Sequence, residues 1–334
     1  MANIYDVAKA ANVSISTVSY VFNGKRPISE EVKAHVLETA SALGYAGGRK
    51  KGSKPQANQL IGLFGSSIEN LGYNIYTHQT LMGIFNVLKN TDYHVLFIPD
   101  GSNASSIWEQ DTALCLQLAG AVVIEPKETE NYYSYFEEKK IPFVVIGRPE
   151  AHNLSTNYVD VDNVSLGYRS MKYFLDRKIS EVLFLNGPKG LTVSEDRKKG
   201  VLLALEEYGL PAEKSMIVHT DFSLDRAYDA VREIYSGSCA FPAVIACSDL
   251  QVIGALNAIR DCGYDCPRDV SLFCTSETYM SANATPRITG MDTKPVQIGE
   301  QTANLLLKLI RKELINPSHI SLPSELHERD SVRT

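Results

Sequence analysis

The chain has 334 residues, of which 44% are hydrophobic and 22% charged, and its formal net charge is −6. This length exceeds what one hydrophobic core supports, so we expect a small domain together with one or two larger ones. No apolar stretch is long enough for a membrane span and no signal-peptide pattern opens the chain, which predicts a cytoplasmic protein without membrane contact.

The positive charge of the chain is concentrated at its N-terminal end. Residues 1–56 hold eight Lys or Arg against four Asp or Glu, a net charge of +4, so the remainder carries −10. A cationic end on an anionic body favours contact with phosphate groups.

Three short helices are predicted within residues 4–43. The first has an apolar stripe at helical spacing, made of Ile4, Val7, Ala8 and Ala11. Ser14 is a suitable N-cap for the second helix, which ends at Asn23-Gly24. The side chains of this helix that face the core would be Val18, Val21 and Phe22. Ser29 is expected to cap the third, whose buried stripe would be Val32, Val36, Leu37, Ala40 and Leu43.

This layout is typical of a helix-turn-helix DNA reader. Many three-helix domains never contact DNA, so the pattern alone leaves both readings open. The short second helix, with small polar residues at its start, and the local positive charge favour DNA binding.

From residue 60 onward, short apolar runs alternate with amphipathic stretches. The first set has strands at 60–64, 94–98, 121–124 and 142–146, and helices near 76–90, 105–118 and 129–139. The second set has strands at 182–185, 216–218, 243–246 and 270–274, and helices near 163–176, 194–208, 223–236 and 249–262. Residues 288–291 and a helix at 295–315 are expected to cross back to the first set. The alternation predicts two α/β lobes, each a doubly wound parallel sheet, with a cleft at the C-terminal strand ends.

The sequence offers little support for an enzyme. No glycine-rich phosphate loop follows a strand, and the seven histidines are dispersed. The cysteines, in mostly apolar surroundings and without metal-site spacing, are expected to be reduced thiols: 115, 239, 247, 262, 266 and 274. We therefore expect no catalytic residues, no metal and no cofactor.

Three segments carry a family resemblance: Tyr5–Ser14, Thr17–Gly24 and Leu43–Tyr45. In this order they resemble the headpiece of the LacI/GalR family of transcriptional regulators. The resemblance continues through Ile141–Arg148, Ser194–Gly200, Pro267–Ser271 and Leu322–Ser331.

The resemblance implies three parts of the chain. These are an all-α headpiece at 1–45, a basic Gly-rich linker or hinge at 46–58, and a two-lobed, periplasmic-binding-protein-like domain for effector binding and dimerisation at 59–334. The first lobe is expected to take approximately 59–148 and 292–320, and the second approximately 149–291 and 321–334.

The implied function is sequence-specific regulation of transcription, by repression. A homodimer would bind a near-palindromic double-stranded operator under control of a small effector in the cleft, with a sugar favoured over a nucleobase. The alternative is a sugar-binding protein without a regulatory role, as in transport, which the basic headpiece and the missing signal peptide disfavour.

The resemblance also implies the DNA contacts. Family members read bases with three positions of the second helix, here Ile15, Ser16 and Tyr20, although Tyr20 could equally hydrogen-bond a phosphate. Thr17 and Asn23 would contact the DNA backbone. The family's hinge helix inserts a leucine into the minor groove, but this chain has Lys54 at that position and three glycines that oppose a helix. We therefore expect a flexible tether with phosphate contacts from Lys50, Lys51 and Lys54.

The same resemblance implies effector contacts around the cleft. Arg197 and Arg148 would hydrogen-bond the effector through their planar guanidinium groups, and Phe222 would stack on it. For Arg197 a solvated helix face, and for Phe222 a core position, remain the alternatives. Ser248 and Asp249 would also face the effector, although helix capping explains at least one of them. Ser276 stands where the family commonly has an aspartate, which leaves open whether Glu277 compensates. The first lobe would contribute Ser66, Ser67 and Tyr76.

Overall fold

The computed structural model describes residues 3–23, 28–43, 59–65, 74–98, 118–124, 132–149, 155–237, 240–314 and 317–333. The chain separates into two compact units, Met1–Ala57 and Asn58–Thr334. Among the described helices, none is both long and apolar enough to cross a membrane.

The first unit contains the three predicted helices, α1 (Ile4–Ala10), α2 (Ile15–Asn23) and α3 (Glu30–Ala42). Asn3 and Asp6 form a capping box at the start of α1, in which each side chain accepts a backbone N–H of the other residue. Asn12 adopts the left-handed conformation (φ 53°) in the turn. Ser14 Oγ then accepts the N–H of Thr17 at 3.0 Å, which confirms the predicted cap of α2.

The core of this unit follows the predicted stripes, with two exceptions on α3. Its buried residues are Val7, Ala8, Ala11, Val18, Val36 and Ala40. Leu37 and Leu43 were expected in this core and are 43% and 40% exposed. Leu37 lies beside the inward-facing Val36 and is turned away from it by the helical rotation, while Leu43 follows the last helical residue. Ser29 occupies the predicted N-cap position of α3, but its side chain makes no capping hydrogen bond.

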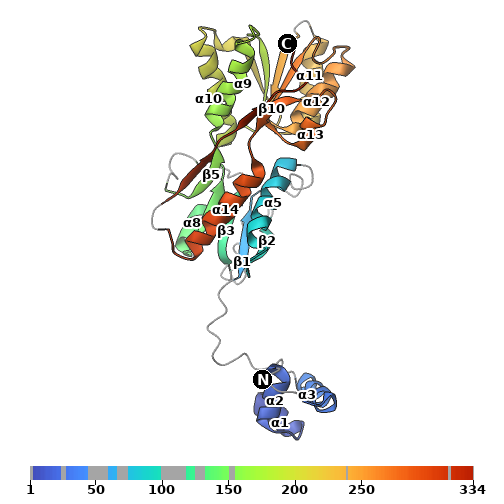
Figure 1. Cartoon of the computed structure of the whole chain (residues 1–334), viewed down its shortest axis with the longest axis vertical. Helices are drawn as coiled ribbons and strands as arrows, with labels where there is room; N and C mark the ends of the chain where they lie inside the picture. The colour runs from blue at the N-terminus through green and yellow to red at the C-terminus, as the bar shows by residue number, and fades with distance from the viewer. Residues whose placement is uncertain are drawn as a thin grey trace. The chain divides into compact units, whose positions relative to one another are not determined.

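The second unit has two six-stranded sheets (Figure 1). The strands of the first sheet are, in spatial order, β11 (His319–Leu322), β5 (Tyr158–Val161), β4 (Phe143–Ile146), β3 (Leu118–Ile124), β1 (Leu60–Phe64) and β2 (His94–Ile98). All neighbouring strands run parallel. The helices that the structure describes around it are α5 (Ile75–Leu88), α8 (Tyr132–Glu138) and α14 (Pro295–Ile310).

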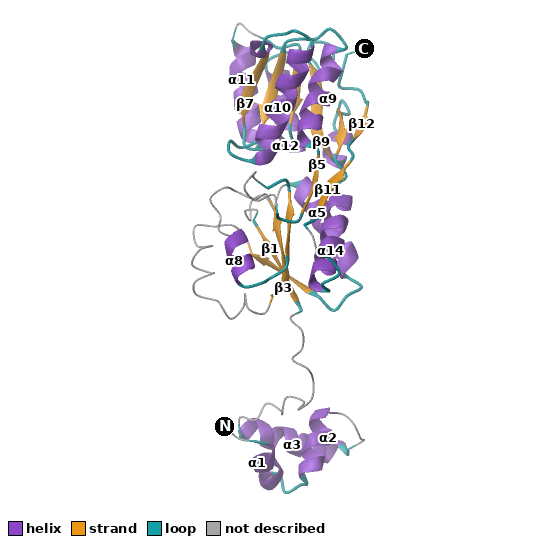
Figure 2. Ribbon diagram, turned by 90° about the vertical axis from the view of Figure 1, so that its left-hand side faces the viewer, coloured by secondary structure: helices purple, strands orange, loops and turns teal. Residues whose placement is uncertain are grey.

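The second sheet repeats this order, with one antiparallel edge. Its strands are β12 (Glu325–His327), β10 (Thr289–Asp292), β9 (Ser271–Glu277), β8 (Ala243–Ala246), β6 (Val182–Asn186) and β7 (Ser215–His219), and only the β12–β10 pair is antiparallel. Its helices are α9 (Asn163–Leu175), α10 (Thr192–Glu207), α11 (Leu224–Ser236), α12 (Asp249–Asp261), α13 (Tyr279–Ala282) and the 3-10 turn η2 (Ala212–Lys214). Helices cover both faces of each sheet, so the predicted doubly wound lobes are confirmed (Figures 1 and 2).

The lobe boundaries lie later in the chain than the approximate ones expected. The strand β5 had not been predicted, and residue 148 precedes it. Because β5 pairs with β4 and with β11, the first lobe extends through Val161. The pairing of β11 with β5 also places all of β11, up to Leu322, in the first lobe. The strand β10 pairs with β9 and β12, so the second lobe extends to Asp292. The helix expected at 105–118 lies outside the described residues except for Leu118, which begins β3.

Glycines bring pairs of helices into close backbone contact. A Cβ on Gly167 of α9 would lie 2.0 Å from the carbonyl oxygen of Arg197, and one on Gly200 of α10 would lie 2.0 Å from that of Val164. Gly83 of α5 and Gly299 of α14 form a similar pair in the first lobe, facing the carbonyl groups of Val296 and Thr80. The α9–α10 contact places the first turn of α9 beside the middle of α10.

The substitution Gly200→Ala should therefore destabilise the second lobe. The added methyl group would meet the backbone of α9, which cannot rotate away, so we expect a loss of about 2 kcal/mol and a Tm lower by a few degrees. Gly237→Ala is the matched control, because its nearest neighbour would be 3.4 Å away. Calorimetry that gave both variants the wild-type Tm would contradict this account of the helix contact.

Candidate functional site

The start of α2 presents small and apolar side chains to solvent. Ile15 is 43% exposed and Ser16 is exposed, whereas Thr17 and Tyr20 are half-buried. Ser14 Oγ lies within hydrogen-bond distance of Ser16 Oγ (2.9 Å) and Thr17 Oγ1 (2.8 Å). These contacts order the first turn of the helix, the part that a helix-turn-helix protein inserts into the major groove. The side chain of Asn23 and residues Lys50, Lys51 and Lys54 lie outside the described part of the chain.

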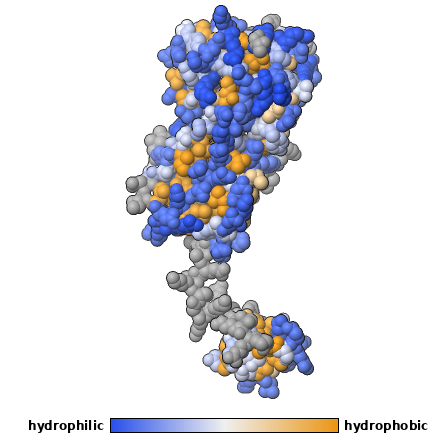
Figure 3. All heavy atoms as spheres, in the orientation of Figure 1, coloured by the Kyte–Doolittle hydropathy of each residue, from blue (hydrophilic) through white to orange (hydrophobic). Residues whose placement is uncertain are grey.

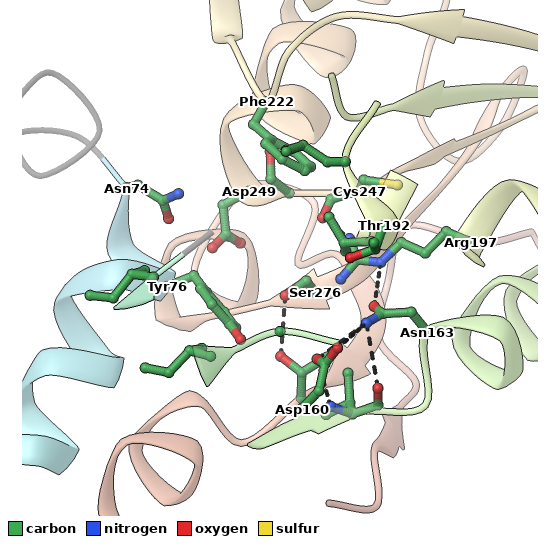
Figure 4. A pocket seen from close by; sticks show the side chains of 18 of the residues that line it. Asn74, Tyr76, Asp160, Asn163, Thr192, Arg197, Phe222, Cys247, Asp249 and Ser276 are labelled. Carbon is green, nitrogen blue, oxygen red and sulfur yellow. Dashed lines mark hydrogen bonds between the residues drawn. The ribbon is translucent and has the colours of Figure 1, made fainter. Parts of the chain in front are cut away.

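A cavity lies between the two sheets of the second unit, at the C-terminal ends of their strands (Figure 4). The first lobe contributes the start of α5 and the ends of β3, β4 and β5, and the second contributes the starts of α9, α10 and α12 and the ends of β8 and β9. This is where ligands bind in open α/β sheets. Of the predicted effector residues, the cavity lining includes Tyr76, Arg197, Phe222, Ser248, Asp249 and Ser276.

Arg197 is the buried cation of this cavity, only 6% exposed. Its Nε donates to Asn163 Oδ1 and its Nη1 to the carbonyl oxygen of Cys247, both at 3.0 Å. Both partners are neutral, and within the described ranges Arg197 forms no ion pair and its Nη2 has no protein partner. One edge of the guanidinium is therefore available to an acceptor in the cavity (Figure 4).

Asp160 lies behind Asn163 and is 7% exposed. Its carboxylate accepts the N–H of Val161 (2.7 Å) and of Arg148 (2.8 Å), and also the amide Nδ2 of Asn163 (3.0 and 3.2 Å). Burial raises the pKa of Asp160 from 3.8 to about 6, although these hydrogen bonds and the charge of Arg197 oppose the shift.

Phe222 owes its position to two unusual backbone features. Asp221 and Phe222 are both left-handed (φ 52° and 56°), which turns the chain sharply after β7. Gly187, after β6, provides the space, because a Cβ there would lie 2.2 Å from Cζ of the ring. The half-buried ring borders the cavity and packs against the main core. The two alternatives expected from the sequence, a cleft position and a core position, therefore each describe part of its environment.

Ser248 and Asp249 have structural partners as well as a place in the lining. Ser248 is the N-cap of α12 and accepts the N–H of Gln251. The Asp249 carboxylate accepts Thr278 Oγ1 at 2.5 Å and the N–H groups of Thr278 and Ser281 at 3.2 Å, which fixes the start of α13. Each side chain therefore stabilises a helix start.

Ser276 faces the cavity and lies 3.1 Å from Thr293, Oγ to Oγ1. The next residue, Glu277, is outside the lining and 4% exposed, paired with Arg329 and His327. Successive side chains of a strand point to opposite faces, so Glu277 cannot stand in for a carboxylate at Ser276.

Arg148 is not part of the lining. Its guanidinium makes a two-pronged ion pair with Asp196 on α10, with Nε–Oδ2 and Nη2–Oδ1 distances of 2.8 and 2.9 Å. Thr192 Oγ1 donates to the carbonyl oxygen of Arg148 at 2.6 Å. This arginine therefore joins the two lobes beside the cavity. Ser66 and Ser67 lie outside the described residues.

Several polar residues of the lining were not predicted from the sequence, namely Asn74, Asp160, Asn163, Thr192 and Thr293. Asp160 had a detectable pattern, since it interrupts the apolar residues of β5 just before a helix start. Asn74, Asn163 and Thr192 lie at helix starts and Thr293 in the turn between β10 and α14, where polar residues are common and carry no specific information.

The buried carboxyl group of Asp160 should give the protein a measurable pH dependence of stability. A native pKa above the unfolded value of 3.8 means that the native state binds more protons between pH 4 and 6, so its free energy of unfolding falls as pH rises through about 6. In Asp160→Asn, the change in this free energy between pH 4.5 and 7.5 should be smaller by roughly 2 kcal/mol. Unfolding measured at both pH values tests this, with exposed Asp162→Asn as control; equal slopes for wild type and Asp160→Asn would reject it.

Comparison with known sequences covers both units. Residues 3–47 match the family described as "Bacterial regulatory proteins, lacI family", and residues 164–332 match "Periplasmic binding protein-like domain". The HTH-type transcriptional repressor PurR of Escherichia coli O1:K1 is 30% identical over 339 residues, which cover 99% of this chain and 97% of PurR. The probable HTH-type transcriptional repressor ExuR of Bacillus subtilis is 29% identical over 337 residues, 100% of this chain and 99% of ExuR.

Solved structures share the fold. A complex of the transcriptional regulator CelR with cellobiose has a TM-score of 0.77 at 23% identity and covers 99% of this chain and 100% of CelR. The lac repressor dimer bound to operator and an anti-inducer has a TM-score of 0.74 at 18% identity, covering 99% of this chain and 98% of that one. The lacI family model matches the first unit, and the relatives that match the full length are transcriptional repressors. The chain therefore belongs to the LacI family of bacterial regulatory proteins and is a transcriptional repressor, not an enzyme.

Proposed function

We propose that this repressor binds its operator as a cytoplasmic homodimer and that a small polyhydroxylated effector, of the sugar class, controls this binding from the cavity of the second unit. The observation that carries the proposal is Arg197, a residue only 6% exposed, whose guanidinium borders the cavity and keeps Nη2 free, among the described residues, after its two neutral partners. An effector oxygen at this open edge of the guanidinium would add a charge-assisted hydrogen bond.

The remainder of the lining supports a polyhydroxylated ligand. The hydroxyl groups of Ser276 and Thr293 can donate or accept, and that of Thr192 can accept, because its proton is donated to Arg148. The ring of Phe222 suits the apolar face of a sugar. The complex of CelR with cellobiose and an Enterococcus faecium LacI-family regulator with bound ribose have the same fold.

Control of DNA binding would come from movement between the lobes. The chain passes between the two sheets after β5, after β10 and between β11 and β12, and the cavity is bounded by residues on both sides. An effector that binds one arrangement of the lobes more tightly shifts the population toward it. Arg148–Asp196 and Thr192–Arg148 are contacts across the lobes that such a shift would strengthen or break.

Dimerisation is proposed because operator half-sites come in pairs and one headpiece buries little surface on DNA. Apolar patches interrupt the polar surface of the first lobe on the face seen in Figure 3. Among the exposed apolar side chains are Met82 (57%) and Phe85 (43%), one helical turn apart on α5. We propose that α5 contributes to the subunit contact.

For the operator contacts, we propose that Ile15 and Ser16 read base edges from the start of α2, with Tyr20 one turn later. Thr17 and Asn23 would contact the DNA backbone, and Lys50, Lys51 and Lys54 would contact phosphate groups from the tether.

The effector proposal is tested by a thermal-shift screen of sugars and nucleobases against the full-length protein, followed by operator release. A sugar should raise the Tm, and Arg197→Ala should weaken its binding at least about tenfold, because a charge-assisted hydrogen bond is lost, and should abolish release of operator. Arg197→Lys keeps the charge if the alanine variant folds poorly, and Arg287→Ala, on an exposed ion pair with Asp330, is the control. A full effector response in Arg197→Ala, or a Tm raised only by nucleobases, would overturn the proposal.

The DNA-contact proposal is tested with Ile15→Ala. The side chain is 43% exposed, so its truncation should spare the fold, yet it should weaken binding to a duplex selected in vitro by roughly fivefold, about 1 kcal/mol. Affinity for random duplex should not change. Leu37→Ala, at a residue equally exposed on α3, is the matched control. An equal loss on selected and random duplexes would show that Ile15 does not read sequence.

A further inference from the structure

Two buried residues of the cavity use their polar atoms on the protein itself. Asn163 is 4% exposed, and its Oδ1 accepts Nε of Arg197 while its Nδ2 donates to the carboxylate of Asp160. A guanidinium can only donate and a carboxylate can only accept, so the amide has one possible orientation between them. The three side chains form a directed chain of hydrogen bonds.

The far end of this chain is attached to backbone. Asp160 belongs to β5 in the first sheet and accepts the N–H groups of Arg148, after β4, and of Val161. Asn163 begins α9, and Arg197 lies on α10, both in the second lobe. The hydrogen bonds therefore run from the sheet of one lobe to the effector-facing guanidinium of the other, along a segment where the chain passes between lobes (Figure 4).

Fixing Nε and Nη1 fixes the whole planar guanidinium. With Asn163 on Nε and the carbonyl oxygen of Cys247 on Nη1, the direction of Nη2 is determined. A carboxylate in direct contact would occupy two of these nitrogens, as Asp196 does on Arg148. The neutral amide spacer leaves Nη2 for a ligand while the charge of Asp160 still attracts Arg197.

We infer that Asp160 and Asn163 are positioning residues, which orient Arg197 for the effector and tie that orientation to the first lobe. The inference rests on the proposed effector site. Asp160 does not itself bind the effector, because the donors of Arg148, Val161 and Asn163 already occupy both of its oxygens.

The first test needs no effector. In full-length protein labelled with ¹⁵N, the Nε–H resonance of Arg197, assigned by its loss in Arg197→Lys, should exchange slowly with water. Asn163→Ala removes the acceptor of this N–H, and Asp160→Ala leaves the Asn163 amide free to rotate away from it. Each variant should therefore speed the exchange at least about tenfold. Asp160→Asn keeps an acceptor oxygen and should restore part of the protection. Asp162→Ala, which changes the capping residue of the same helix, is the matched control and should have no effect.

Protection that survives in both alanine variants would overturn the inference, as would equal exchange in Asp160→Asn and Asp160→Ala. Circular dichroism detects an alanine variant that fails to fold. In that case the comparison is made with Asp160→Asn alone, whose exchange should be faster than in wild type and in the Asp162→Ala control; equal rates in all three would overturn the inference.

The second test uses D-ribose and cellobiose as probes in calorimetric titrations. Asp160→Ala should weaken binding of the better probe about tenfold in the wild-type background and leave it unchanged in an Arg197→Ala background, because it acts only through that residue. Additive losses would overturn the positioning role. If neither probe binds while the exchange results hold, the proposed sugar class fails and the positioning of Arg197 stands.

Discussion

A buried guanidinium held by neutral acceptors is the constraint on which the effector cavity depends. Arg197 can reach Asn163 only because α9 and α10 pack with their backbones in contact, and Gly167 and Gly200 are what permit that approach. The polar contact in the cavity and the helix packing behind it therefore depend on each other. A larger residue at either glycine would separate the donor from its acceptor as well as loosen the lobe.

The two buried aspartates of the cavity have internal partners. Asp249 fixes the start of α13, and Asp160 accepts backbone N–H groups and the Asn163 amide. Four hydrogen bonds reach Asp160 and three reach Asp249, so most of their acceptor sites are used. The edge of Arg197 and hydroxyl groups such as Ser276 and Thr293 have more capacity left for a ligand. This combination suits a ligand that both donates and accepts hydrogen bonds, which is the chemistry of a polyol.

Arg148 shows how one residue type at a strand end can serve two purposes. Its position in the sequence suggested a ligand contact, and its fork geometry would suit one. In the structure the Asp196 carboxylate accepts hydrogen bonds from Nε and Nη2 of Arg148. The backbone N–H of Arg148 donates to Asp160, and its carbonyl oxygen accepts the hydroxyl of Thr192. The residue thus connects the lobes beside the cavity, and a change in the arrangement of the lobes would change these contacts.

The sequence by itself determined the three headpiece helices, the cap at Ser14 and the alternation of strands and helices in both lobes, because periodicity and capping act between residues close in the chain. Its resemblance to the LacI/GalR family also pointed to Arg197, Phe222 and Ser276 as neighbours in one cleft, and all three line the cavity. Only the tertiary structure decided that Asp160 and Asn163 support Arg197, that Glu277 faces away and that Leu37 is exposed. The support of Arg197 depends on which distant segments pack together, and no local pattern carries that information. For Glu277 and Leu37, local periodicity sets the direction of the side chain relative to its neighbours, and tertiary packing decides which face is covered.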